Sequence, residues 1–316
     1  MENECLVCSK PESLIRVMVR STYSMQKLRI QLGNRIFAQF RLKVLGITSS
    51  QTEEEMAAEE AKILKQIRNS YDLLTDGVIH TITARNFKGR GIISDFTEYV
   101  LIKQYLDMQE AEENSFKQLT HELKKYPIYQ EFLSKVKGVG PAISAVIISE
   151  MDPTAATYPS SFCKYAGLDV VTMIENPDKT MTPLEQGEGR TRNKRHLVTV
   201  QYKDKEGETQ EKLSVTYKPF LKSKLLGVLG PSFIKAGIKN GDNKYGQLYY
   251  DYKTRLQNMP KHKEKTKLHI HRMAIRYIVK HFLIDLHIKW RELEGLPVST
   301  PYHEGKLGII HGEGER

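Results

Sequence analysis

The stretch Leu133-Ser134-Lys135-Val136-Lys137-Gly138-Val139-Gly140-Pro141-Ala142-Ile143-Ser144-Ala145 decides how the centre of this chain folds. Pro127 suits the first turn of a helix expected over 127–137, and Pro141 opens a second helix that runs to about Glu150. The two glycines between these helices permit a sharp turn and a close approach of the backbone to a ligand. Val139 is expected to point into the core between the helices. The stretch therefore predicts a helix-hairpin-helix.

The turn of this motif has the features of a phosphate-binding site. A helix that starts at Pro141 presents free backbone amides and the positive end of its dipole to an anion. Such a site holds a nucleic-acid backbone without reading bases, so its affinity should depend on salt and not on sequence. The alternative is a tight turn with only a packing role. The predicted contacts are Lys135, Lys137, Gly138, Val139, Gly140 and Ala142.

The residues before the motif predict long helices with short connections. Apolar residues fall every four positions within 12–45, and Gly46 is a suitable stop. Thr52 and Glu55 form a capping box that predicts a helix over about 53–75. A glycine-rich basic loop is expected over 85–92, and a long helix over about 95–125. Pairing of these helices, or dimerisation, is the simplest explanation of their apolar stripes.

After the motif, the sequence alternates short helices, loops and a β-hairpin. Ser160 is expected to cap a short helix that ends at Gly167, and 174–190 is expected to be a polar loop. Leu197–Tyr202 and Leu213–Tyr217 alternate in the manner of paired strands. Helical sequence then extends from Pro219 to about Glu294, with breaks at 237–242 and 259–260.

These elements predict a mainly α fold with one inserted β-hairpin. We expect a helical connector or dimerisation region over 1–126. A helix-hairpin-helix domain with long basic helices should follow over 127–298, and a tail over 299–316. No run of about 18 apolar residues is present, so we expect no membrane span. The amino end lacks the pattern of a signal peptide, and three cysteines fit a reducing compartment. We expect a cytoplasmic, nucleoid-associated protein.

Positive charge is concentrated in one part of the chain. The formal net charge is +10 and the pI is about 9.2. From Lys212 to Lys289 there are 17 lysines and arginines against 4 acids. Arg272, Arg276 and Lys280 recur every four residues on one predicted helix, beside an apolar face. This segregation indicates a polyanionic partner, DNA above all. A solvated basic surface is the alternative.

Three ordered segments carry a family resemblance. They are Val136–Pro141, Ile148–Asp152 and Phe162–Leu168, which give a glycine turn, an apolar helix with an acidic end, and a Lys-x-Tyr-Ala-Gly-Leu helix end. Here the chain resembles the carboxy-terminal domain of insertion-sequence transposases of the bridge-RNA-guided recombinase type, over roughly 130–300. The resemblance implies a homo-oligomeric protein acting on DNA in transposition, with a guide RNA as an additional partner to be tested. Lys222 and Lys224, in the basic helical region, are predicted to contact DNA.

Two departures from the family bear on catalysis. Full-length members begin with a resolvase-like domain whose acids bind the catalytic metal, and residues 1–60 show no apolar strand bearing an Asp. Members also carry a nucleophilic serine before a basic helix, where this chain has the predicted β-hairpin. Ser214, with Lys212 and Lys218 near it, is the candidate nucleophile, and Mg²⁺ would be its cofactor if it cleaves DNA. An ordinary strand serine is the alternative, and it makes the chain a non-catalytic nucleic-acid-binding module.

Other candidate functional residues have weaker support from the sequence. Cys5 and Cys8 have the spacing of half a zinc site, but no second pair lies nearby. His269 and His271 stand two apart on a predicted helix and so face different sides. The tyrosines of 245–252 are suited to stacking on bases, with a core role as the alternative. A third hypothesis, a helical scaffold that meets an acidic protein, predicts no DNA binding at low salt.

Overall fold

A computed structural model describes residues 13–46, 62, 65, 83–89, 93–169, 173–175, 181–183, 198–203, 207–215, 217–238 and 242–299. The fold is mainly α, as the sequence predicts. The chain divides into two compact units, residues 17–119 and residues 1–16 with 120–316. No helix in the described ranges has the length and apolar character needed to cross a membrane. The expected helix over 53–75, the Cys5/Cys8 pair and the tail lie outside the described residues.

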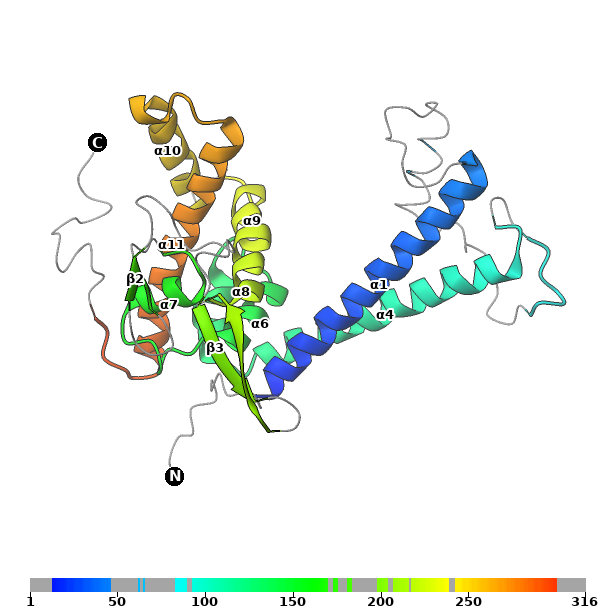
Figure 1. The fold of residues 1–316 in the computed structure, drawn as a ribbon, viewed down its shortest axis with the longest axis horizontal. Helices are drawn as coiled ribbons and strands as arrows, with labels where there is room; N and C mark the ends of the chain where they lie inside the picture. The colour runs from blue at the N-terminus through cyan, green and yellow to red at the C-terminus, as the bar shows by residue number, and fades with distance from the viewer. Residues whose placement is uncertain are drawn as a thin grey trace. The chain divides into compact units, whose positions relative to one another are not determined.

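The smaller unit is built from two long helices that lie side by side (Figure 1), α1 (Leu14–Leu45) and α4 (Phe96–Leu123). Gly46, with a φ of +64°, ends α1 as expected. One end of the pair holds an apolar cluster around Ile36, Phe40 and Ile102. Farther along, the Arg29 side chain donates to Glu112 and to the Tyr105 hydroxyl. Both predicted helices are confirmed to within two residues at each end.

The larger unit packs its helices around α11 (Lys267–Leu293), whose buried face includes Ile278, Phe282 and Trp290. Figure 1 shows α10 (Lys244–Asn258), α9 (Gly230–Lys235) and α7 (Pro159–Tyr165) gathered along it. The predicted motif forms α5 (Pro127–Glu131), the short 3-10 helix η2 (Leu133–Lys135) and α6 (Pro141–Glu150). A second 3-10 turn, η5 (Pro260–His262), links α10 to α11.

A single continuous helical run ends with α9. It consists of α8 (Pro219–Lys224), a π-helical stretch labelled η4 (Leu225–Leu229), and α9. Leu221, Leu225, Leu229 and Phe233 are all fully buried, although they are spaced four residues apart. A spacing of four drifts around an ordinary helix of 3.6 residues per turn. The wider π turn, with its i→i+5 hydrogen bonds, offsets that drift and keeps the four side chains on one face.

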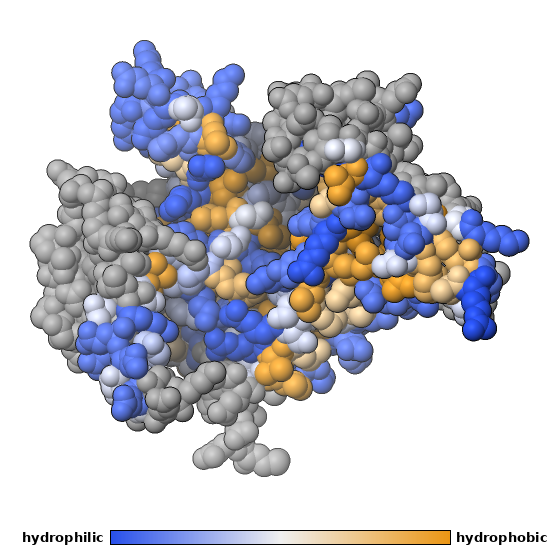
Figure 2. All heavy atoms as spheres, turned by 45° about the vertical axis from the view of Figure 1, so that its right-hand side comes forward, coloured by the Kyte–Doolittle hydropathy of each residue, from blue (hydrophilic) through white to orange (hydrophobic). Residues whose placement is uncertain are grey.

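Two antiparallel hairpins complete the described elements: β1 (Met173–Glu175) with β2 (Met181–Pro183), and β3 (Val198–Lys203) with β4 (Thr209–Ser214). The β3–β4 hairpin is predicted, although its second strand begins four residues earlier than expected. On the face drawn in Figure 2, apolar patches stand between larger hydrophilic areas.

Three local predictions are wrong. The helix expected over 127–137 breaks at Phe132, whose ring stacks on Phe282 of α11 at 6.0 Å between centroids, so a tertiary contact overrides local preference. Ser160 does not cap α7, because Pro159 takes the first helical position and Tyr158 the cap position. The polar loop expected over 174–190 contains all of β2 and two of the three residues of β1, and both strands are too short to show strand alternation.

Candidate nucleic-acid interface

The glycine turn, residues Val136–Gly140, joins η2 to α6 with a hydrogen bond from the Val139 amide to the Val136 carbonyl at 3.0 Å. Gly138 has a φ of +94°, and a Cβ on it would lie 2.9 Å from the Phe233 ring and 3.1 Å from the Phe233 Cα. A side chain at this position is therefore excluded both by backbone conformation and by α9. Gly138 serves the packing role that the sequence left as an alternative.

Gly140 differs from Gly138 in backbone conformation, in exposure and in the space around it. Its φ is −91°, it is exposed, and a Cβ on it would meet nothing within 4 Å. It is the cap residue of α6, and no side chain caps that helix end. The Ser144 amide and hydroxyl both donate to the Gly140 carbonyl at 3.0 Å. The approach to the first turn of α6, at Ala142, is therefore open at the glycine that sequence analysis assigned to a ligand.

Val139 is half-buried beside the turn, so it reaches the core only in part. The lysines of the motif reach acidic partners. Lys135 bonds Glu131 at 2.8 Å, and Lys137 bonds Asp242 at 2.7 Å. The hydrogen bond from Lys137 lowers the pKa of the Asp242 carboxyl below its usual value. A phosphate at the turn would therefore compete with Asp242 for Lys137.

Lys235 is a basic neighbour of the turn that sequence analysis did not single out. It is exposed in the last turn of α9, two residues after the Phe233 that packs on Gly138. It counts among the 17 cations of the basic region, but only the contact between α9 and the turn distinguishes it from the others.

The predicted α8 contacts lie against aromatic rings. The Lys222 ammonium stands 4.2 Å from the centre of the Tyr217 ring, and the Lys224 ammonium 5.6 Å from that of Phe220. Burial lowers the pKa of Lys224 from its ordinary value. Both stems therefore pack on the protein, which holds the two cations in place along α8.

The basic stripe of α11 lies on its outer side. Arg272 and Arg276 are exposed and Lys280 is half-buried, while Ala274, Ile275, Ile278 and Val279 face the core. Arg276 precedes Phe282, which packs on Phe132 and Phe233 beside the turn, by six residues, or about 9 Å of helix. The stripe and the motif thus lie in the same compact unit.

Ser214 is the last residue of β4, half-buried and paired opposite Val198. The two lysines expected to activate it lie against other groups. The Lys212 ammonium stands over the Tyr202 ring at 4.5 Å, and that of Lys218 lies 3.6 Å from Glu150. Within the described ranges, no three His, Cys, Asp or Glu side chains gather as metal ligands would.

The remaining candidates mostly serve the core. Tyr245 and Tyr249 are buried, and the Tyr249 hydroxyl lies 2.6 Å from His271 Nδ1. Tyr250 is exposed, whereas Tyr252 stacks on Tyr277 at 3.7 Å between ring centres. No protein-family model, curated protein or solved structure matches this chain.

Proposed function

We propose that this protein binds the phosphate backbone of DNA through its helix-hairpin-helix and acts as a transposase-like protein in DNA transposition or recombination. One observation carries the binding proposal: the exposed start of α6, where Gly140 takes the cap position and no side chain caps the helix. The positive end of a helix dipole and its free first-turn amides suit a phosphate oxygen. The role in transposition rests on the resemblance of residues 130–300 to insertion-sequence transposases.

The charges around the turn support the same proposal. Lys137 is about one-third exposed, and Lys235 stands at the end of the helix that packs on Gly138. Arg272 and Arg276 add exposed positive charge on α11 of the same compact unit. Contacts of this kind give affinity without sequence preference, and each neutralised phosphate adds about 0.9 to the slope of log K against log salt.

A pair of substitutions at Gly140 tests the proposal. Gly140→Asp places a carboxylate that caps the α6 amides and repels a phosphate, whereas the methyl group of Gly140→Ala is too short to reach them. Binding of the full chain to short duplexes of two unrelated sequences is measured across a salt series. We expect Gly140→Asp to lose about tenfold or more in affinity for both duplexes, and Gly140→Ala to bind as the wild type does. Equal binding by the two variants contradicts the proposal.

A second candidate is a binding module that cuts nothing. The positions of Lys212 and Lys218, each held against a group other than Ser214, favour it. Incubation with supercoiled plasmid and Mg²⁺ separates the two candidates, with Ser214→Ala as the control. Nicking that depends on Ser214 supports a transposase. Binding without nicking supports the module.

A further inference from the structure

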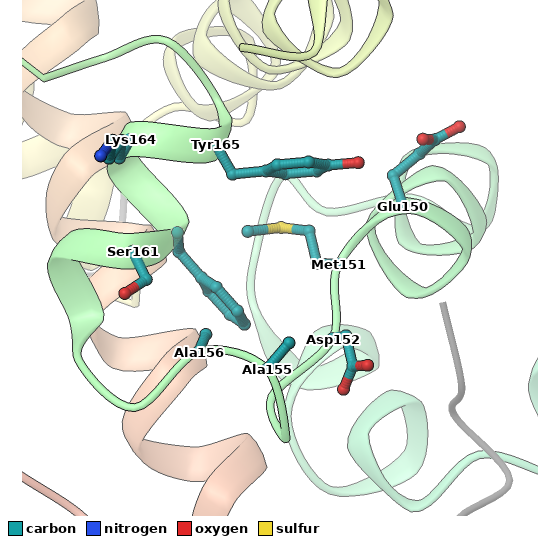
Figure 3. A pocket seen from close by; sticks show the side chains of 9 residues that line it. Glu150, Met151, Asp152, Ala155, Ala156, Ser161, Lys164 and Tyr165 are labelled. Atoms are coloured by element: carbon teal, nitrogen blue, oxygen red, sulfur yellow. The ribbon is translucent and has the colours of Figure 1, made fainter. Parts of the chain in front are cut away.

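A pocket of about 370 Å³ lies at the opposite end of α6 from the glycine turn, in the same compact unit. Its walls come from the end of α6, the loop that follows it, and α7. In Figure 3 the Tyr165 ring lies over Met151 with its hydroxyl directed toward Glu150, and Ala155 and Ala156 lie on the other side of the space. Phe162 also lines it. The pocket is thus a largely apolar slot with one exposed aromatic wall.

The floor of the pocket is held rigidly from beneath. Arg291 of α11 donates to the carbonyls of Pro153 at 2.6 Å and Ala156 at 3.0 Å. His287, also buried, lies with Nε2 2.7 Å from the Ala156 carbonyl, and its ring meets Phe162 edge-on at 5.2 Å. A loop secured by two buried polar side chains keeps its shape whether or not a ligand is present.

The charged residues around the pocket restrict which class of ligand it can bind. Glu150 is buried, with the Arg16 guanidinium at 3.7 Å and the Lys218 ammonium at 3.6 Å from its carboxylate. Asp152 stands on the same side of the slot. Asp152 Oδ1 accepts from the Thr154 amide at 2.8 Å and hydroxyl at 2.6 Å, and Lys164 lines the pocket at the end away from Glu150 (Figure 3). A flat heterocycle that carries an amine satisfies both the aromatic wall and the acceptors.

We propose that this pocket accepts one unpaired nucleobase, stacked on Tyr165, with its exocyclic amine directed toward Glu150 and Asp152. The inference rests on the proposed function, because the base belongs to a strand whose phosphate is held at the glycine turn. The ten residues of α6 span about 15 Å, which corresponds to about four nucleotide steps of 3.4 Å along a duplex. In this proposal the turn and the pocket contact the same strand, one through its backbone and the other through a base.

The test compares duplexes that differ by one unpaired nucleotide. The full chain is titrated with a fully paired duplex and with the same duplex carrying a single unpaired adenine or thymine. We expect the unpaired adenine to raise affinity by about fivefold or more, the fold-change typical of one stacked base, and thymine to raise it less. Equal affinity for the paired and adenine-bearing duplexes overturns the proposal, and equal affinity for adenine and thymine overturns the role of the carboxylates.

Variants attribute the effect to the pocket. Tyr165→Leu and Ala155→Trp should each abolish the preference for the unpaired adenine, the first by removing the ring and the second by filling the slot from an exposed position. Tyr165→Phe should retain it. Tyr158→Leu, at a more exposed tyrosine outside the pocket, should leave the preference unchanged. A preference that survives in Tyr165→Leu and Ala155→Trp refutes the pocket while leaving the backbone site intact. A paired duplex that binds Gly140→Asp as tightly as wild type refutes the proposed function instead.

Discussion

The two glycines of the turn should respond oppositely to the same substitution. In Gly138→Ala, the new methyl group occupies a left-handed backbone position, which costs about 1–2 kcal/mol. It also meets the Phe233 backbone at 3.1–3.2 Å, where no side-chain rotation can relieve the contact. Overpacking of this kind adds about 1–3 kcal/mol. We therefore expect Gly138→Ala to lower the free energy of unfolding by about 2–5 kcal/mol.

Gly140→Ala is the matched control. At a φ of −91° and with nothing within 4 Å of the added Cβ, alanine should be neutral or stabilise by up to about 1 kcal/mol, through the unfolded chain. Trp290, the only tryptophan of the chain, is fully buried in the unit that holds the turn, so its fluorescence reports the unfolding of that unit in denaturant. If the two variants unfold at the same denaturant concentration, the assignment of Gly138 to packing and Gly140 to open surface is wrong.

Three more predictions follow from the same unit. Asp242→Asn releases Lys137 and removes a negative charge near the turn, so duplex affinity should rise about two- to fivefold at low salt and the gain should vanish at high salt; an affinity below wild type would count against competition for Lys137. Burial lowers the pKa of His287, so the folded protein takes up a proton there less readily than the unfolded chain does. The contribution of His287 to the free energy of unfolding should be fully present above about pH 6.5 and decrease as the pH falls below that value. In urea titrations at several pH values, the free energy of unfolding of His287→Gln should fall less steeply with decreasing pH. An unchanged dependence on pH would exclude His287 as a contributor. Burial also raises the pKa of the Cys163 thiol to about 11, so in a Cys5→Ser, Cys8→Ser background a thiol reagent should label the chain only after unfolding, and rapid labelling of the native protein would contradict the buried position.

The proline residues at the ends of the second helix made part of the motif predictable. Helix α6 matches its expected range residue for residue, because Pro141 sets its start and Asp152-Pro153 prevents its continuation. The positions of Lys135 and Lys137 beside the turn also follow from sequence. Their acidic partners do not, since Asp242 lies 105 residues from Lys137 and no local pattern links them.

The features that sequence could not supply all depend on packing between distant elements. The helix breaks at Phe132 because this side chain contacts α11. Gly138 packs against another helix and Gly140 does not, because α9 lies against Gly138 alone. The pocket likewise needs Arg291 and His287, more than 130 residues away, to secure the loop after α6. Glu150, Asp152 and Tyr165 lie in the segments that carry the family resemblance, but no sequence pattern predicts that they line one cavity.

The π-helical stretch between α8 and α9 accommodates about one residue more than ordinary winding would. With all residues retained and ordinary α winding restored, the twelve steps from Leu221 would carry Phe233 about 120° off the buried face and away from Gly138. Removal of one residue from Leu225–Leu229 with the same winding would instead leave Phe233 within about 20° of that face. The fold is therefore compatible with the loss of one residue here, and a homologue that lacks it is expected to have an ordinary α-helix behind its glycine turn.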